Sequence, residues 1–237
     1  MPSIIGASAQ KAFNEIVGDA LHTPLLFGGL RREYGSADQV RAFNSSFLLD
    51  AAGRIAGSYD KTYLLLFGEY LPFGETFPKL YEWSPHTGRL TPGSRLEALP
   101  FGPYRIGVII CYEDILPRFV RQAVRASDPD LLVNLTNDAW FGDSAEPWIH
   151  LTLARSRAIE QRRFLIRSTN SGVSAFIDAS GRINSHTGVF TRENLVGEVR
   201  MMRMWTLYSA IGDLIGWIGL ALAAVFAFRQ GVSTAVC

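Results

Sequence analysis

One stretch constrains the fold of this chain more than any other: residues 107–114, Gly-Val-Ile-Ile-Cys-Tyr-Glu-Asp. Three β-branched residues precede Cys111, and a short unbroken apolar run is typical of a strand buried on both faces. Polar residues follow Cys111, so the strand ends there. Pro117 suits the first turn of a following helix, because its missing N–H needs no partner at that position. We therefore expect Cys111 at the junction of a strand and a helix.

The position of Cys111 allows two interpretations. Free cysteines are usually small buried hydrophobes, and Cys111 can be one of these. A residue at the end of a strand also lies at the carboxyl edge of its sheet, where α/β folds place ligands. The residues elsewhere in the chain favour the second interpretation.

The composition excludes several classes of protein. The chain has 237 residues, which suits one large α/β domain with a small appendage. Its formal net charge is +1, so nothing in it indicates a nucleic-acid partner. The two cysteines, Cys111 and Cys237, form no disulfide or zinc pattern, and the histidines are scattered without ligand spacing. We therefore predict no metal and no other cofactor.

The C-terminal stretch predicts a membrane-spanning helix from about residue 210 to residue 228. Residues 214–228 carry no charged side chain, and about 20 apolar residues cross a bilayer. Trp205 and Trp217 lie towards one end and Arg229 closes the other, as interfacial anchors do. The alternative is a buried core helix of a soluble protein, but no polar face recurs along the stretch.

The rest of the chain alternates helices, strands and turns. Apolar periodicity predicts helices over residues 7–21, 118–126 and 145–163. Short apolar runs predict strands over residues 24–29, 43–49, 55–59, 130–137, 164–168, 173–179 and 195–200, with turns at 50–54 and 180–182. Loops are expected over 31–40 and 71–103, the latter with at most a short helix near 77–81. Because the strands alternate with helices but also form hairpins, we expect an α/β fold with a pair of mixed sheets.

Three side chains suggest nucleophilic chemistry: Lys61, Glu69 and Cys111. A thiol of pKa ~8.5 is mostly protonated at neutral pH and needs a nearby base or cation. A lysine can supply the charge and stabilise an oxyanion, and a glutamate can move a proton. Acyl transfer through a thioester would use all three groups. The spacing alone leaves open that Lys61 and Glu69 form a surface ion pair.

The sequence around these side chains resembles a known superfamily. Residues 60–72 (Asp-Lys-Thr-Tyr-Leu-Leu-Leu-Phe-Gly-Glu-Tyr-Leu-Pro) resemble the lysine segment of the carbon–nitrogen hydrolase (nitrilase) superfamily, and 110–113 (Ile-Cys-Tyr-Glu) resemble its cysteine segment. Residues 137–142 (Asn-Asp-Ala-Trp-Phe-Gly), 147–151 (Pro-Trp-Ile-His-Leu) and 154–160 (Ala-Arg-Ser-Arg-Ala-Ile-Glu) resemble one branch, the apolipoprotein N-acyltransferases. The resemblance runs from about residue 4 to residue 229.

This resemblance implies a reaction with two substrates. A fatty acyl chain passes from a phospholipid donor to the amino group of the N-terminal diacylglyceryl-cysteine of an apolipoprotein acceptor. The resemblance implies a thioester on Cys111, an oxyanion stabilised by Lys61, and Glu69 orienting Lys61 or assisting proton transfer. The other residues that it assigns to shaping or binding at the site are Tyr112, Glu113, Asn137, Asp138, Trp140 and Phe141.

The resemblance also implies an architecture and a location. The expected fold is a nitrilase-like α-β-β-α sandwich over residues 1–203, followed by a C-terminal transmembrane helix and tail over 204–237. The branch stands in the bacterial inner membrane with its catalytic domain on the periplasmic face. The expected partners are therefore the phospholipid, the apolipoprotein and the bilayer, with no nucleic acid.

Two departures from the family pattern are visible. The branch carries several membrane helices ahead of the catalytic domain, and its catalytic glutamate lies in a Trp-x-Glu segment that would precede residue 1. Glu15 falls in the middle of a predicted helix and does not match it. We therefore expect a C-terminal portion that lacks the general base and the first strand, and that shows little or no acyl transfer alone. The alternatives are a soluble-type amidase or nitrilase, and an inactive membrane-tethered protein that binds lipid or lipoprotein. His150 is expected to be a polar contact of the core.

Overall fold

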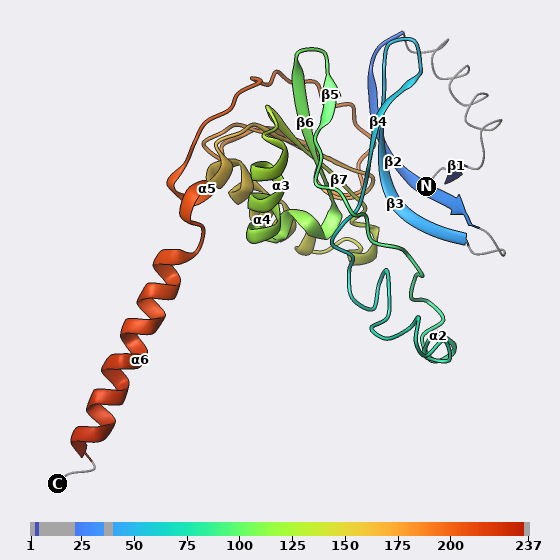
Figure 1. Ribbon diagram of the computed structural model, residues 1–237. Helices are drawn as coiled ribbons and strands as arrows, with labels where there is room; N and C mark the ends of the chain where they lie inside the picture. The colour runs from blue at the N-terminus through green and yellow to red at the C-terminus, as the bar shows by residue number, and fades with distance from the viewer. Residues whose placement is uncertain (1–2, 5–21, 36–39, 235–237) are drawn as a thin grey trace.

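The computed structural model describes residues 3–4, 22–35 and 40–234 of the chain. The helix predicted over residues 7–21 lies outside the described residues. The described part forms two β-sheets that pack face to face, with helices on the outer face of one of them (Figure 1). The prediction of an α/β fold with two mixed sheets is therefore confirmed.

The first sheet has four strands in the order β1-β2-β3-β4. These strands are β1 (Ser3–Ile4), β2 (Leu25–Tyr34), β3 (Val40–Leu49) and β4 (Ile55–Asp60). β1 is parallel to β2, and the other pairs are antiparallel. The loop predicted over residues 31–40 is wrong at both ends, because β2 continues to Tyr34, which pairs with Val40. The polar side chain of Arg31 is accommodated in the strand because it binds Asp60 of β4.

The second sheet has six strands in the order β10-β9-β8-β7-β6-β5. These are β5 (Leu99–Phe101), β6 (Tyr104–Ile110), β7 (Leu131–Thr136), β8 (Leu165–Thr169), β9 (Ala175–Ile177) and β10 (Ile183–His186). The three central strands β6, β7 and β8 are parallel, whereas the outer pairs are antiparallel. The sequence patterns predicted β6 to β9 but missed the short outer strands β5 and β10.

The strand predicted over residues 195–200 is wrong. No strand is assigned to these residues, and Val196 is 91% exposed. The apolar pattern of this segment resembles that of a strand, but in the described structure no strand pairs with the segment. Without backbone partners, the segment cannot join a sheet. The segment instead runs across the molecule towards the C-terminal helices (Figure 1).

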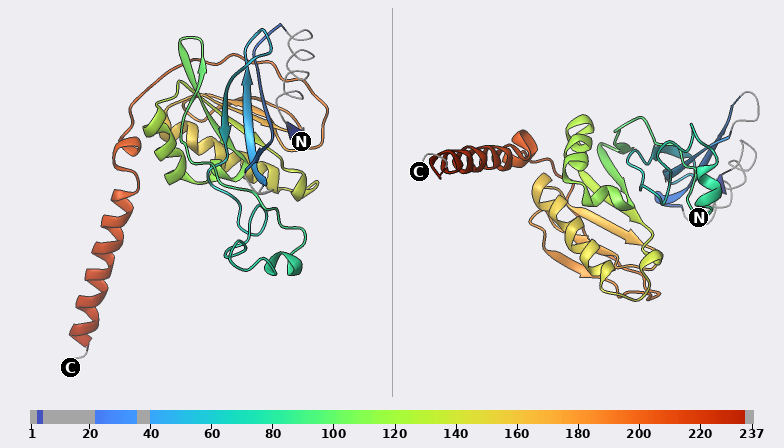
Figure 2. Two further views of the ribbon diagram at one scale, coloured as in Figure 1. Left: turned by 45° about the vertical axis from the view of Figure 1, so that its right-hand side comes forward. Right: turned by 90° about the horizontal axis from the view of Figure 1, so that it is seen from below.

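The helices of the described part are few and lie mostly on one side. They are α2 (Leu80–Trp83), α3 (Pro117–Ser127), α4 (Glu146–Gln161), α5 (Leu207–Ile211) and α6 (Leu214–Thr234), with short 3-10 helices η1 (Cys111–Ile115) and η2 (Ala139–Phe141). α3 and α4 cover the second sheet on the face that points away from the first sheet (Figure 2). Pro117 occupies the first turn of α3, as predicted.

Strand β6 belongs to two hydrophobic cores. Ile109 is 1% exposed and packs with residues of α3 and α4, among them Val120 and Leu151. Val108 and Ile110 point the opposite way and pack against the first sheet. Alternate residues of β6 are therefore buried on opposite faces, which is what its unbroken apolar run predicts.

The C-terminal helices leave the body of the molecule at a glycine. Gly212 has a φ of +57° and separates α5 from α6, which projects outward (Figures 1 and 2). Arg121 of α3 donates to the carbonyl oxygens of Tyr208 and Ser209 at 3.0 and 2.9 Å, which fixes α5 to the body. Trp217 is 67% exposed, so the alternative of a buried core helix is wrong.

The membrane-spanning helix predicted over residues 210–228 is not confirmed. Within the described residues, no helix has both the length and the apolar character needed to cross a bilayer. The proposed division of the chain between residues 203 and 204 stays a prediction.

The core between the second sheet and its helices generates a test. Leu151 and Leu153 lie on the same helix, but Leu151 is 1% exposed and Leu153 is 46% exposed. We expect Leu151→Ala to lower the free energy of unfolding by about 2–5 kcal/mol, because it leaves a cavity in a closely packed core. Leu153→Ala should change it little. Urea denaturation of the two variants measures the difference, and equal losses would contradict this packing.

Candidate active site

Cys111 lies where β6 ends and η1 begins, as predicted. Its φ is +51°, a left-handed conformation that few residues other than glycine adopt. Such a residue costs about 1–3 kcal/mol and persists only where its surroundings impose it. The side-chain amide of Asn134 contributes by donating to the Cys111 carbonyl oxygen at 3.4 Å. Cys111 is a free and partly exposed thiol.

Glu113 is fully buried and accepts four hydrogen bonds. One carboxylate oxygen accepts from the Tyr59 hydroxyl at 2.9 Å and from the backbone N–H groups of Thr62 and Tyr63 at 2.8 and 2.9 Å. The other oxygen accepts from the backbone N–H of Ile110 at 2.8 Å. Burial raises the pKa of Glu113 to about 7, although the four donors act to lower it.

These bonds bring the lysine and cysteine segments together. Thr62 directly follows Lys61, and Ile110 directly precedes Cys111, so one carboxylate holds the neighbours of both residues. With both oxygens occupied, Glu113 has little capacity to serve as a proton acceptor for a substrate. We therefore regard Glu113 as a residue that positions the two segments.

Lys61 and Glu69 form a buried ion pair. The Lys61 ammonium lies 2.6 Å from a carboxylate oxygen of Glu69, and the two side chains are 1% and 16% exposed. The alternative of a surface ion pair is wrong, because Lys61 is enclosed. The same Glu69 oxygen accepts from the Leu65 backbone at 2.8 Å, and the other accepts from the Asn44 amide at 2.9 Å. The role of Asn44 was not predicted, because Asn44 and Glu69 are 25 residues apart in the chain.

The predicted site residues of the loop 137–142 lie in two different environments, one buried and one exposed. Asp138 is 1% exposed, whereas Trp140 and Phe141 are 80% and 42% exposed. Asn137 accepts a hydrogen bond from the Ala139 backbone at 3.1 Å, which starts η2. The ring of Tyr112 lies 6.3 Å from that of Tyr63, so this predicted residue also contacts the lysine segment.

A buried cluster of four charged side chains includes Asp114 of η1, and we call it the charge cluster: Asp114, Asp138, His150 and Arg167. The two ring nitrogens of His150 lie 2.8 Å from Asp114 and 3.0 Å from Asp138. Arg167 donates to both carboxylates and, at 2.8 Å, to the amide oxygen of Asn134. His150 is thus a polar contact of the core, as expected. Arg167 was not identified from the sequence, because its carboxylate partners lie far from it along the chain.

The charge cluster shifts the protonation of its members. Burial acts to lower the pKa of His150, but the hydrogen bonds to Asp114 and Asp138 outweigh it and raise that pKa to about 9. Burial likewise acts to raise the pKa of Asp138, yet His150 and Arg167 hold it below its usual value. At neutral pH His150 is therefore protonated and Asp138 is ionised.

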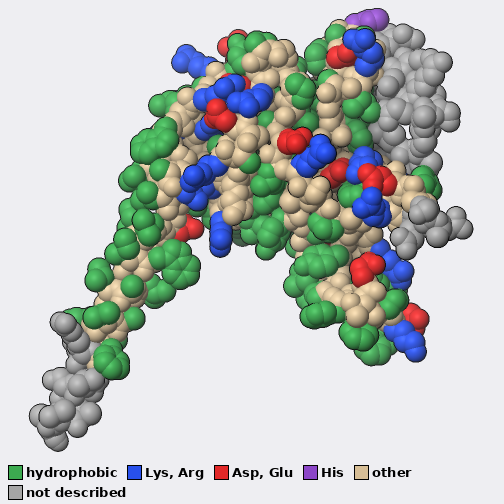
Figure 3. Space-filling model, in the orientation of Figure 1, with side chains coloured by type: hydrophobic (Ala, Val, Ile, Leu, Met, Phe, Trp, Pro, Cys, Tyr) green, Lys and Arg blue, Asp and Glu red, His purple; other side chains and the backbone are tan. Residues whose placement is uncertain are grey.

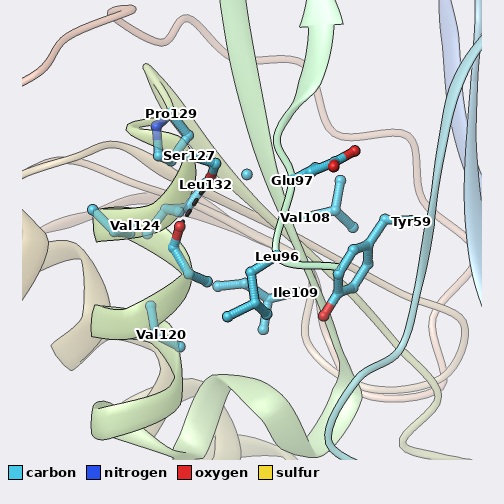
Figure 4. A pocket seen from close by; sticks show the side chains of 12 residues that line it. Tyr59, Leu96, Glu97, Val108, Ile109, Val120, Val124, Ser127, Pro129 and Leu132 are labelled. Atoms are coloured by element: carbon cyan, nitrogen blue, oxygen red, sulfur yellow. Dashed lines mark hydrogen bonds between the residues drawn. The ribbon is translucent and has the colours of Figure 1, made fainter. Parts of the chain in front are cut away.

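A small cavity lies beside β6 and α3, apart from Cys111 (Figure 4). Its walls include Leu96, Val120 and Leu132, and its volume of about 10 Å³ is roughly that of one water molecule. It cannot hold an acyl chain. In the described part of the chain, no group of three or more His, Cys, Asp or Glu side chains is arranged to hold a metal ion.

The structure has two facing sheets, a cysteine at a strand end, and a buried lysine–glutamate pair whose segment Glu113 joins to that of the cysteine. A family model described as carbon–nitrogen hydrolase matches residues 20–206. The chain belongs to the carbon–nitrogen hydrolase family.

Several relatives share one name. The chain is 39% identical to an apolipoprotein N-acyltransferase of Geobacter metallireducens, over 81% of this chain and 37% of that protein. It is 35% identical to apolipoprotein N-acyltransferase 2 of Leptospira interrogans, over 81% of this chain and 40% of that protein. The chain therefore spans about two fifths of the length of these curated relatives.

Solved structures support the fold. A carbon–nitrogen hydrolase from Helicobacter pylori G27 matches with a TM-score of 0.58 and 17% identity, over 78% of this chain and 65% of that one. An amidase from Nesterenkonia sp. matches with a TM-score of 0.53 and 20% identity, over 77% of this chain and 63% of that one. The nitrilase-like α/β fold of the prediction is confirmed.

The buried ion pair generates a second test. Glu69→Gln should lower the free energy of unfolding by about 3–5 kcal/mol, because it leaves the enclosed Lys61 charge without a carboxylate. Glu97→Gln is a matched control, since Glu97 pairs with Arg95 at 3.8 Å while both side chains are largely exposed. The control should change little. Equal losses in urea denaturation would show that Lys61 does not depend on Glu69.

The raised pKa values of Glu113 and His150 predict how stability depends on pH. Both groups bind their proton more tightly in the folded chain than at their usual pKa values of 4.5 and 6.5. Each contribution is therefore complete below the usual pKa and disappears as the pH rises through the folded value. Glu113 should lose its contribution between pH 4.5 and about 7, and His150 between pH 6.5 and about 9. Each loss amounts to roughly 3 kcal/mol.

Thermal midpoints measured from pH 4.5 to 9.5 check this expectation. The wild-type midpoint should fall across the whole range. His150→Gln should flatten the curve above pH 7 only, and Glu113→Gln should flatten it below pH 7 only. A flat wild-type curve would contradict both assignments.

Proposed function

We propose that this chain transfers a fatty acyl group from a phospholipid to the N-terminal amino group of a diacylglyceryl-cysteine lipoprotein. The observation that carries the proposal is the Glu113 carboxylate, which joins the neighbours of Lys61 to those of Cys111. The names of the relatives at 35–39% identity support the choice of substrates. Because those proteins are much longer than this chain, the activity of the whole enzyme is part of the proposal.

The proposed reaction has two half-reactions. In the first, the Cys111 thiolate attacks an ester carbonyl of the phospholipid, and Lys61 donates a hydrogen bond to the oxyanion that forms. The ester C–O bond breaks, the lysophospholipid alkoxide takes a proton, and a thioester remains on Cys111. In the second, the lipoprotein amine attacks the thioester, loses a proton and leaves as an amide, which regenerates the thiolate. Glu69 keeps the Lys61 ammonium oriented throughout.

Exposed apolar side chains near the site support an acyl substrate. The segment after Lys61 exposes Phe67, Phe73 and Trp83 at 63%, 76% and 81%. Figure 3 shows hydrophobic side chains gathered over the lobe around α2 and along α6. Large exposed apolar patches mark sites that contact lipid or protein. We accordingly propose that the enzyme works at a bilayer surface, at the periplasmic face of the bacterial inner membrane.

The acyl-enzyme can be tested directly. The purified chain, kept in mild detergent, is incubated with phospholipid vesicles that carry palmitoyl chains and analysed as an intact mass and by peptide mapping. We expect a palmitoyl adduct on Cys111 that hydroxylamine removes at neutral pH and that forms slowly, because Glu113 has little capacity to act as a general base. Cys111→Ala should abolish the adduct, whereas Cys237→Ser should keep it. An adduct on Cys237, or one that persists in Cys111→Ala, would contradict the nucleophile assignment.

The same preparation separates the alternatives. Transfer of the palmitoyl group to a synthetic diacylated lipopeptide supports the acyltransferase. Ammonia released from small amides, without an adduct from phospholipid, supports an amidase of the same family. Saturable lipopeptide binding without any adduct or ammonia supports a binding protein that lacks turnover.

A further inference from the structure

We propose that His150 is a positioning residue that couples the nucleophile turn to the loop of residues 137–142, so that Trp140 and Phe141 receive the apolar chain of the substrate beside Cys111. This inference rests on the proposed function only in taking Cys111 as the nucleophile. The side-chain hydrogen bonds of His150 in the described structure are those to Asp114 and Asp138, so it acts on the thiol and the loop aromatics through these two carboxylates.

The geometry of the charge cluster supports the coupling. Asp114 belongs to η1, the same short helix that begins with Cys111, and Asp138 directly precedes η2, which carries Trp140 and Phe141. The imidazole of His150 contacts one carboxylate with each nitrogen, at 2.8 and 3.0 Å. The two turns are therefore held side by side through one ring. All four charged side chains are at most 5% exposed, so water cannot replace these contacts.

The hydrogen-bond count requires a cationic imidazole. Both ring nitrogens face carboxylate oxygens, and a neutral imidazole has only one N–H to donate. Arg167 is the second cation, so the cluster is balanced only when His150 is protonated. The pKa of about 9 agrees with this requirement. The other groups that face the cluster are Asn134 of β7 and Glu146 at the start of α4.

Packing leaves the cluster little freedom to rearrange. A Cβ atom added to Gly172 would lie 2.1 Å from a carboxylate oxygen of Asp138, so the backbone between β8 and β9 presses against this side chain. The Nε of Arg167 is buried without a hydrogen-bond partner in the described structure. An unpaired buried donor costs stability, and buried ion clusters often contribute no net stability. We infer that the cluster serves to fix one arrangement of the two turns.

The experiment compares two alkylating probes of the same thiol. All proteins carry Cys237→Ser, which leaves Cys111 as the single cysteine of the chain. Labelling rates of Cys111 are measured by mass spectrometry with iodoacetamide and with an iodoacetamide that bears an octyl chain. Both reagents attack the same thiolate, so the ratio of their rates cancels ionisation of the thiol and reports how the site receives an apolar chain.

We expect His150→Gln to lower the octyl-to-plain rate ratio about tenfold or more, because small displacements of a substrate-facing group have large effects on rate. Trp140→Ala should lower the ratio in the same way. The plain iodoacetamide rate should stay within about threefold, since the thiol remains accessible. His86→Gln, the same substitution at an exposed histidine, should leave both rates unchanged.

A second measurement uses the protein that keeps His150, so that its result does not depend on whether the His150→Gln variant folds. Between pH 7 and 10 the rate ratio should fall with a midpoint near the His150 pKa of about 9, and this transition should be absent in His150→Gln. A ratio that is independent of pH and of His150, or an equal loss with both probes, would overturn the coupling. If neither probe labels Cys111, both this inference and the nucleophile assignment fail. If labelling behaves as expected but phospholipid yields no adduct, the proposed function alone fails.

Discussion

The site depends first on one carboxylate. Glu113 comes two residues after Cys111, yet it accepts three of its four hydrogen bonds from Tyr59 of β4 and from Thr62 and Tyr63 in the loop that follows β4. The backbone N–H of Lys61 still donates to Asn44 of β3 at 2.7 Å, but the loop after Lys61 continues beyond β4. The buried carboxylate of Glu113 holds the start of this loop to the turn of Cys111, and it satisfies backbone N–H groups that would otherwise be unpaired in the interior. Without it, the two sheets could pack while the reactive groups remained apart.

A second set of charges lies on the other side of the nucleophile turn. Glu113 connects this turn to the first sheet, and the charge cluster connects it to β8, α4 and the loop of residues 137–142. The left-handed conformation of Cys111 is thus enclosed between two buried polar groups. Buried charges are expensive unless they are paired. Glu113 and the charge cluster both hold the turn that contains Cys111. We infer that these buried charges fix the backbone geometry of Cys111 as well as contributing to stability.

The sequence predicted those parts of the fold that depend on local pattern. The apolar run before Cys111 indicated β6 with both faces buried, and Pro117 indicated the start of α3. Structure that depends on contacts between distant residues was not predicted. Residues 31–34 look like a polar loop until Asp60, which is 29 residues away from Arg31, is placed beside that arginine.

The residues of the site also fall into two groups, those that the sequence identified and those that only the structure reveals. Lys61, Glu69 and Cys111 were identifiable because they stand in a recognisable segment of sequence. The roles of Asn44 and Arg167 emerge only from the pairing of strands, since each meets its carboxylate across more than 20 residues of chain. Sequence patterns carry no direct record of such partners.

The attachment of α5 has a mechanical consequence. Arg121 grips the carbonyl oxygens at the end of α5, and a Cβ atom on Gly212 would lie 3.1 Å from its guanidinium carbon. Arg121 belongs to α3, the helix that follows η1 and therefore Cys111 itself. The point at which α6 leaves the body is therefore tied through α3 to the short helix that begins with Cys111.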